Sequence, residues 1–490
     1  AEVSARGHWR RKGLVLESTD PGAWVRSQKA LGSGDFVVRA RMALETVGST
    51  GAALSLGETH FVLDTQDGHI EMMAGGVRSQ GVKGKQTGSL IKAGEMFDLV
   101  VQRKGLQLTV LVNGTEALQS GTHDREIGGL QLRGRDSVLR IETLEMAGGL
   151  IDRIPFTRLT WHDHPSGRIE RVQLVDTGNS GLTCLFQTSG GGNPGLYAAR
   201  SRTGGDKWED FELVINKDDH NGQSLASFGA VSNPGRDVIW AAYTVGDSNQ
   251  RVFLTQGRSR GRNWSRSEEI TADVKPAGRY VWLTGGGVVL QNNERKRGRI
   301  LIPMIERAEK NEQQLYLMVS ESGREWSRIG PVMRHCDRGA EIVEDLQGRV
   351  WLATGAKPKQ RSQFYRRWVV SEDGGDTWSE PKPSMLPDSG LTDGELARVD
   401  AGRGTEIWYY ATTDGPVGAD LPEQTNLTLY GSKDQGRTWV PLKRFLYGRG
   451  MYPSIVPLGP DSCAVAYRKE PKDWGSQEVR VAVLRNLWKR

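Results

Sequence analysis

Long hydrophobic runs and cysteines are scarce in this 490-residue chain. No stretch of 18 or more apolar residues occurs, and a helix needs about that many to cross a bilayer, so we expect no membrane span. The three cysteines are scattered and odd in number, which matches neither a metal-binding spacing nor a disulfide framework. Cys184 and Cys463 stand in strand-like apolar runs and are expected to be buried thiols. Cys336 lies near candidate site residues, but we do not expect it to be a nucleophile.

Charge of one sign is not in large excess either. The formal net charge of +6 is small for this length and favours a soluble surface of mixed sign, with attraction to acidic glycans or nucleic acid as the alternative. No basic stripe is interleaved with aromatic residues, so nucleic acid is not an expected partner. Gly285-Gly286-Gly287 precedes a strand rather than a helix and is not a phosphate loop. We predict no metal and no cofactor.

What the chain does have is glycine, with 62 residues, and tryptophan, with 15, which together suit an all-β protein rich in tight turns. One eight-residue pattern recurs along residues 200–440 and ends each time in tryptophan. Its tryptophans fall roughly 50–60 residues apart, a period typical of propellers and other repeat arrays. The two clean copies are Ser371–Trp378 and Ser432–Trp439, and the weaker ones are Ser201–Trp208, Gly257–Trp264 and the shorter Ser320–Trp326.

The pattern has a local physical reason, which is a turn after an apolar strand such as Trp368-Val369-Val370. Serine and aspartate side chains can accept hydrogen bonds from turn amides, and the glycine at the fifth position can adopt a positive φ. The tryptophan is then free to pack between neighbouring sheets. We interpret the pattern as structural and place none of its residues in a site.

Residues 1–150 lack the tryptophan repeat and alternate apolar and polar residues with period two, as in 36–42 and 97–101. The run Leu106–Val112 leads into Asn113-Gly114, a hairpin signal. These features predict a β-sandwich, similar in strand order to concanavalin and laminin-G jelly rolls, that either binds sugar or serves as a spacer.

Residues 151–490 predict a six-bladed β-propeller, with five blades carrying the tryptophan turn. A strand from about 151–162 is expected to complete the last blade, which removes exposed sheet edges. The inner strands should converge on a central channel, so their first residues are where a site is expected. These strands are predicted near 171–175, 224–228, 287–290, 341–344, 395–399 and 452–456.

The repeated turn resembles the Asp box of the sialidase superfamily, S-x-D-x-G-x-T-W, and the order of strands over about 330 residues is similar to it. The resemblance implies an exo-α-sialidase that releases terminal sialic acid. Sialidases of this superfamily hold the sugar carboxylate with three arginines and use a tyrosine nucleophile assisted by a glutamate. Guanidinium groups match a carboxylate bidentately, and a neutral phenol is not repelled by that carboxylate.

Carried over to this chain, the first arginine is Arg171, with Arg168 and Arg153 as rivals. The second is Arg366, with Arg367 as its rival. The third position holds Gln424, a departure that supplies hydrogen bonds without charge.

The nucleophile is Tyr452 at the start of the last inner strand. Its glutamate partner is Glu341, and Glu344 is the alternative that matches the family's buried structural glutamate. The loop from Gln187 to Pro194, where the family keeps its aspartate acid, has no carboxylate.

The acid therefore has to come from elsewhere. The candidates are the residues before the second inner strand, with further carboxylates at the starts of other inner strands. In order of position these are Asp218, Asp219 and His220, and then Asp337, Asp393 and Glu395.

Arg279 and Arg449 are also candidates for lining the pocket, with Tyr280, Trp282 and Tyr447 beside them; inter-blade packing is the alternative. The expected partners are sialylated glycans or glycoproteins. Two other functions stay open, a glycosidase or lyase acting on another acidic glycan, and a glycan-binding propeller without catalysis. The chain starts at Ala1-Glu2-Val3, and we expect the mature form of a secreted, periplasmic or cell-surface protein.

Overall fold

The computed structural model describes most of the chain, and its strands and short helices form two compact units, residues Ala1–Arg153 and Ile154–Arg490. The described residues are 3–6, 9–12, 15–18, 23–44, 52–56, 59–63, 70–73, 82–83, 90–121, 128–134, 138–152, 154, 156–159, 168–190, 193–246, 250–276, 278–307, 312–356, 366–384, 386, 394–413, 425–469 and 477–488. Among them no helix is long and apolar enough to span a bilayer.

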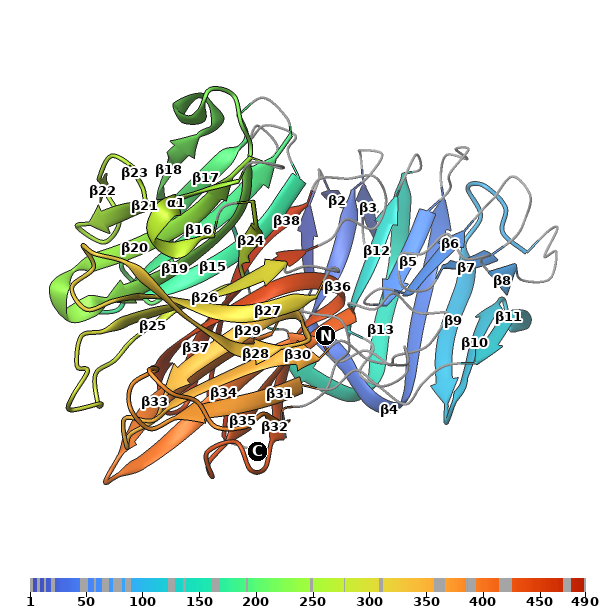
Figure 1. Ribbon diagram of the computed structural model, residues 1–490. Coiled ribbons are helices and arrows are strands. Elements are labelled where there is room, and N and C mark those ends of the chain that lie inside the picture. Colours follow the sequence, from blue (N-terminus) through green and yellow to red (C-terminus); the bar gives the residue numbers. More distant parts are fainter. Residues whose placement is uncertain are drawn as a thin grey trace. The chain divides into compact units, whose positions relative to one another are not determined.

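The first unit is one strongly curved 13-stranded sheet, drawn in blue to teal in Figure 1. Its central strand β4 is long enough to pair with β9, β12, β13 and β1 in turn. The strands are β1 (Val3–Arg6), β2 (Trp9–Lys12), β3 (Val15–Ser18), β4 (Trp24–Leu44), β5 (Ala52–Leu56), β6 (Thr59–Leu63), β7 (Ile70–Met73), β8 (Val82–Lys83), β9 (Phe97–Lys104), β10 (Gln107–Val112), β11 (Thr115–Gly121), β12 (Gly128–Gly134) and β13 (Leu139–Asp152).

The alternation predicted from sequence fits this sheet. In β9 every second residue is buried, and one hydrophobic cluster that includes Phe61, Phe97 and Val110 fills the inner face. Asn113 and Gly114 form the β10–β11 hairpin, both with positive φ. The curved sheet agrees with the predicted β-sandwich, while the jelly-roll strand order stays a prediction.

The second unit is a six-bladed propeller of antiparallel sheets (Figure 1). Blade one is β15 (Arg168–Gly178), β16 (Gly181–Ser189), β17 (Gly195–Ser201) and β18 (Glu209–Asn216), and blade two is β19 (Leu225–Asn233), β20 (Val238–Val245), β21 (Arg251–Arg258), β22 (Asn263–Trp264) and β23 (Glu268–Glu269). Blade three is β24 (Tyr280–Leu283), β25 (Val288–Val289), β26 (Ile300–Arg307), β27 (Gln313–Ser320) and β28 (Ser327–Arg334), and blade four is β29 (Cys336–Glu344), β30 (Val350–Ala356), β31 (Arg366–Ser371) and β32 (Lys382–Pro383). Blade five is β33 (Glu395–Gly402), β34 (Thr405–Thr413), β35 (Thr425–Ser432) and the first half of β36 (Val440–Gly459). Blade six is the second half of β36, β37 (Ser462–Lys469), β38 (Glu478–Arg485) and β14 (Phe156–Arg158). The short helices η1 (Lys217–His220), η2 (Pro234–Arg236) and α1 (Thr271–Val274) lie in the connections.

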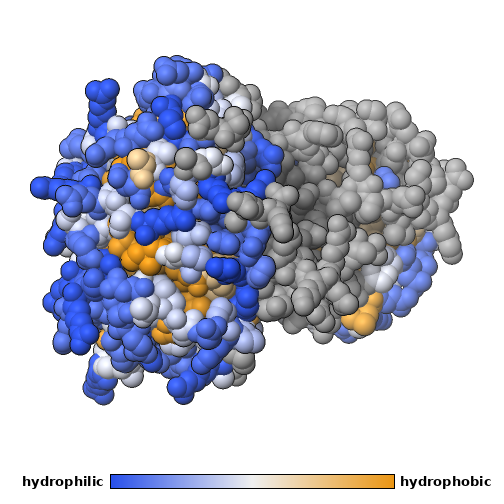
Figure 2. Space-filling model, in the orientation of Figure 1, coloured by the Kyte–Doolittle hydropathy of each residue, from blue (hydrophilic) through white to orange (hydrophobic). Residues whose placement is uncertain are grey.

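Two features close the ring. The long strand β36 pairs with β35 through its first half and with β37 through its second half, so it joins blades five and six. Strand β14 pairs with β38 and completes the last blade with residues from the start of the unit, as predicted. Among the described residues, apolar clusters lie between each pair of neighbouring blades, including the last and the first. On the face of this unit that Figure 2 shows, hydrophilic residues surround smaller hydrophobic areas.

The tryptophan turns behave as their chemistry predicts. In the turn of blade four, the Asp373 carboxylate accepts hydrogen bonds from the amides of Asp376 and Thr377, at 3.0 and 2.9 Å. Gly375 has a φ of 100°, and the Trp378 indole donates to its carbonyl at 3.1 Å. The box tryptophans pack against the clusters between their own blade and the preceding one. Each turn therefore ties one blade to the blade before it.

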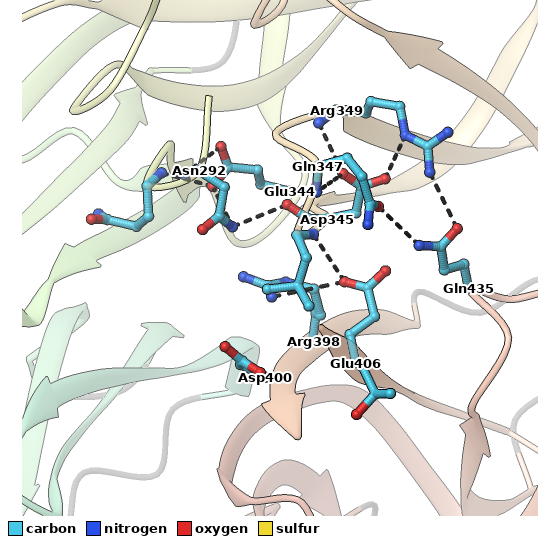
Figure 3. Close-up of polar contacts among 12 residues, drawn as sticks. Asn292, Glu344, Asp345, Gln347, Arg349, Arg398, Asp400, Glu406 and Gln435 are labelled. Carbon is cyan, nitrogen blue, oxygen red and sulfur yellow. Dashed lines mark hydrogen bonds and ion pairs between the residues drawn. The ribbon is translucent and has the colours of Figure 1, made fainter. Parts of the chain in front are cut away.

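The far ends of the inner strands are tied together by a polar network (Figure 3). The Glu344 carboxylate accepts from the backbone amides of Gln291, Asn292 and Asn293 at 2.7 to 3.0 Å, which connects blades three and four. Glu406 accepts from the Leu346 amide at 3.0 Å and connects blades four and five. Glu344 of blade four is therefore bonded to a turn within blade three, which is a structural contact.

Candidate functional site

The first residues of the inner strands surround a cavity in the propeller unit, where about 490 Å³ of space is not filled by atoms and part of that space is open to solvent. Blades one, three, four, five and six contribute to its wall, and blade two supports it through Ala230, whose amide and carbonyl both bond to the Gln173 side chain. The lining residues are Arg171, Val172, Gln173, Thr284, Gly285, Gly286, Gly287, Ala340, Glu341, Ile342, Gly394, Glu395, Leu396, Tyr452 and Pro453.

Glycine shapes the side of the cavity that blade three provides. A Cβ atom on Gly286 would lie 2.9 Å from the Gln173 amide nitrogen and 3.1 Å from a Glu395 carboxylate oxygen. A Cβ on Gly287 would lie 2.5 Å from the Leu301 carbonyl oxygen. The glycine run thus lets the backbone of blade three approach these side chains closely.

Glu341 and Arg366 form a buried ion pair. Strand β29 carries Glu341 and strand β31 carries Arg366, and the guanidinium donates to the carboxylate at 2.6 Å with both side chains almost fully buried. The Gly394 amide donates to the same oxygen at 3.3 Å. Arg366 also lies over the Tyr410 ring, at 5.6 Å from the ring centre. This pairing holds the Glu341 carboxylate at the cavity wall, and Arg366 stands behind it.

Tyr452 lies between two cations at the start of the last inner strand segment. The guanidinium carbon of Arg171 is 5.3 Å from its ring centre and that of Arg468 is 4.8 Å away. Its φ is 51°, in a β-bulge between Met451 and Ser454. A bulky residue in this left-handed region costs about 1–3 kcal/mol, and such strain clusters at functional sites. The neighbouring positive charges stabilise negative charge that develops in this part of the cavity.

Glu395 is the second carboxyl group at the cavity wall. Burial raises its pKa to about 8. The hydrogen bond from Ser454 opposes this shift, the charge of Glu341 adds to it, and Arg171 and the Ile455 amide again oppose it. The cavity wall therefore has one carboxyl group paired with an arginine and one whose pKa is raised by burial.

Asp218, Asp219 and His220 are not among the residues that line this cavity. They form the short helix η1, where the Asn216 and Asp219 side chains cap the backbone reciprocally. His220 is buried at 3.0 Å from the Tyr243 hydroxyl and 4.4 Å from the Phe253 ring centre. Burial lowers its pKa. Asp218 and Asp219 therefore belong to a helix with a capping box, and His220 packs against aromatic residues.

The remaining predicted arginines have other surroundings. Arg279 pairs with Glu306 at 3.9 Å and does not line the cavity. Arg168 is exposed and pairs with Glu170 at 3.6 Å, while Arg367 donates to the carbonyls of Arg334 and His335.

Several predicted site residues fall outside the description. Gln424, Asp393 and Arg153 lie outside the described residues. For Asp337, Tyr447 and Arg449 only the backbone is described, and that of Arg449 pairs with Thr425.

The predicted thiols are buried, and that of Cys336 donates to the Met333 carbonyl at 3.3 Å. No group of three or more histidine, cysteine, aspartate or glutamate residues within the described ranges is arranged to hold a metal ion. Sequence inspection missed Gln173, Thr284 and Arg468, since nothing in their local pattern distinguishes them from ordinary strand residues. The Gly285–Gly287 run was a visible signal, although its use as a cavity wall was not predicted.

Comparisons with known proteins agree with this architecture. Solved structures of similar fold include the Hadza microbial sialidase Hz136, with a TM-score of 0.58 and 14% identity over 95% of this chain and 96% of that one. The K499G mutant of NanB sialidase from Streptococcus pneumoniae has a TM-score of 0.56 and 12% identity over 93% and 95% of the two chains. A mutant Trypanosoma rangeli sialidase with trans-sialidase activity has a TM-score of 0.54 and 12% identity over 67% and 58%.

At identities of 12 to 14%, the similarity to these solved structures establishes the fold of the chain and nothing more. No curated protein sequence matched the chain. A family model described as the BNR repeat-like domain matches residues 182–460, which is more than half of the chain. The chain therefore belongs to the BNR repeat-like domain family and has the propeller fold of sialidases.

Proposed function

We propose that the propeller is an exo-acting glycoside hydrolase that removes a terminal acidic sugar of the sialic acid type from a glycan. The observation that carries this proposal is the meeting of Arg171, Glu341 and Tyr452 at one cavity, although they are distant in sequence. The sialidase fold of the structural neighbours supports the same class of substrate.

Each of the three residues has a role that suits this reaction. Arg171 is the cation for the sugar carboxylate, and its guanidinium provides paired donors for that group. Tyr452 is the nucleophile, because a neutral phenol can approach a carboxylate-bearing anomeric carbon without charge repulsion. Glu341 accepts the phenol proton and is kept ionised for that purpose by Arg366.

The test is the release of methylumbelliferone from its sialoside by the purified full chain. Wild-type protein is expected to release it, and Tyr452→Phe is expected to lower kcat by at least about 100-fold while the thermal melting temperature stays close to wild type. Glu372→Gln, an exposed change in the blade-four turn, is the matched control and is expected to act like wild type. Wild-type activity that survives Tyr452→Phe would remove the tyrosine from its role.

A second function has one observation in its favour. Arg366 is neutralised by Glu341, and Gln424 occupies the position of the family's third arginine, so the cavity holds less positive charge than three arginines would supply. That balance suits a glycosidase or lyase for a uronate-containing glycan. Activity on uronate polymers with none on sialosides would favour this function, and glycan binding without any product would favour a non-catalytic propeller.

A further inference from the structure

The proposed hydrolysis also needs a group that protonates the leaving oxygen. The loop from Gln187 to Pro194 has no carboxylate. Among the described residues that line the cavity, the carboxyl groups belong to Glu341 and Glu395. Glu341 is committed to its ion pair with Arg366 at 2.6 Å, which favours its charged form and makes it a poor proton donor.

We propose that Glu395 is the general acid and base of this cavity: its carboxyl proton goes to the glycosidic oxygen, and its carboxylate later takes a proton from the attacking water. This inference rests on the proposed function. It assigns the acid to the start of the fifth inner strand, a different element from the first-blade loop in which the sialidase resemblance places it.

The position of Glu395 supports this role. It opens strand β33 directly at the cavity wall, and a carboxylate oxygen lies against the Gly286 backbone, 3.1 Å from where a Cβ would stand. Tyr452 and Arg171 line the same cavity. A sugar whose anomeric carbon faces Tyr452 would therefore have its leaving oxygen within the same enclosed space as Glu395.

The surroundings of Glu395 favour a carboxyl group that carries a proton at neutral pH. Burial raises its pKa to about 8, and the charge of Glu341 acts in the same direction, while Ser454, Arg171 and the Ile455 amide act against it. The Ser454 oxygen accepts from the Leu174 amide at 2.8 Å. This contact fixes the serine oxygen and leaves its own proton for Glu395, so the carboxyl group is anchored at the cavity wall.

The proton balance closes over one turnover. In the first step Tyr452 attacks the anomeric carbon as its phenol proton passes to Glu341, the bond to the glycosidic oxygen breaks, and the Glu395 proton leaves with the aglycone alcohol. In the second step the Glu395 carboxylate takes a proton from water, whose oxygen bonds to the anomeric carbon as the tyrosine oxygen departs and takes its proton back from Glu341. Glu395 is then protonated again, Glu341 is ionised again, and the net reaction consumes one water molecule.

The test compares Glu395→Gln with wild type on two substrates of the same terminal sugar. A dinitrophenyl glycoside has a leaving group that needs no protonation, whereas a natural oligosaccharide has an alcohol leaving group that does. We expect kcat/KM to fall by at least about 100-fold on the oligosaccharide and by less than about tenfold on the dinitrophenyl glycoside. Glu372→Gln is again the matched control, and thermal melting checks the fold of each variant.

The outcomes separate the two proposals. If wild-type protein hydrolyses neither substrate, the proposed function fails. A different result is possible if wild type hydrolyses both substrates. If Glu395→Gln is then as active as wild type on both, or loses activity by the same factor on both, the assignment of Glu395 is overturned and the proposed function stands.

A second variant keeps the assignment testable if Glu395→Gln does not fold. Ser454 stabilises the carboxylate form of Glu395, so its removal in Ser454→Ala raises the pKa of Glu395 further. We expect the basic limb of the kcat/KM profile, which lies near pH 8 in wild type, to move to higher pH. A limb that does not move, or that moves to lower pH, would count against Glu395.

Discussion

The Arg366 guanidinium donates to the Glu341 carboxylate at 2.6 Å, with both side chains almost fully buried, Glu341 at the cavity wall and Arg366 behind it. The predicted role of Arg366 as a ligand of the substrate stays a prediction. Because its cation already has an anionic partner, we propose that Arg366 acts through Glu341 by holding that carboxylate in place.

Removing Arg366 should therefore destabilise the protein. Arg366→Met leaves the buried Glu341 carboxylate without its cation, at a cost of about 3–5 kcal/mol in the free energy of unfolding. The double variant with Glu341→Gln removes the stranded charge and should recover part of this loss. Urea denaturation of the two single variants and the double variant measures the coupling, and strictly additive losses would show that the two groups do not depend on each other.

The pKa of Glu395 predicts a pH dependence of stability. Its folded value of about 8 lies above the unfolded value of about 4.3, so between these values the folded state binds a proton that the unfolded state lacks. Stability is lost as pH rises through this window, by up to roughly 1.4 kcal/mol per pH unit, and Glu395→Gln removes the loss. The variant should gain stability relative to wild type between pH 5 and pH 8.

Urea denaturation of wild type and Glu395→Gln at pH 5 and pH 8 measures this gain in the free energy of unfolding. Because the other titrating groups are the same in both proteins, their contribution cancels in the difference. A difference that is the same at both values would mean that Glu395 titrates normally in the folded protein.

The close approach at Gly286 predicts a sharp effect from one methyl group. Gly286→Ala places a Cβ 2.9 Å from the Gln173 amide nitrogen and 3.1 Å from the Glu395 carboxylate, so both side chains must shift. We expect kcat to fall at least about tenfold in the hydrolysis assay, since small displacements of catalytic groups are costly. Gly235→Ala, where the nearest atom is the Asn233 side-chain oxygen at 3.5 Å, is the control and should act like wild type.

The fold could be predicted from sequence because its signals are local and repeated. The turns at Trp378 and Trp439 need only serine, aspartate and glycine at fixed offsets, and each copy marks the end of a blade's third strand. The closing strand β14 was predictable for a different reason, since a propeller with an unpaired last blade would expose a sheet edge.

The site could be predicted only in part. The starts of the inner strands were the expected location of a site, and Arg171, Glu341 and Tyr452 do line one cavity there, because strand order decides which residues meet at that end of the channel. The acid that we propose, Glu395, could not be singled out in this way. Asp219 looks like a channel residue in sequence, but it caps η1, and the environment of Glu395 comes from Ser454 and Glu341 on other blades. Partners that are distant in sequence decide protonation, and no local pattern records them.

The step on which the proposed function depends is the attack of Tyr452 on a terminal acidic sugar bound in the cavity. A difluorinated analogue of that sugar slows release of the covalent intermediate, so incubating active protein with it and locating the adduct by peptide mass spectrometry tests this step. We expect time-dependent inactivation with the sugar attached to Tyr452. An adduct on Glu341 or Glu395, or an active protein that forms no adduct at all, would rule out Tyr452 as the nucleophile.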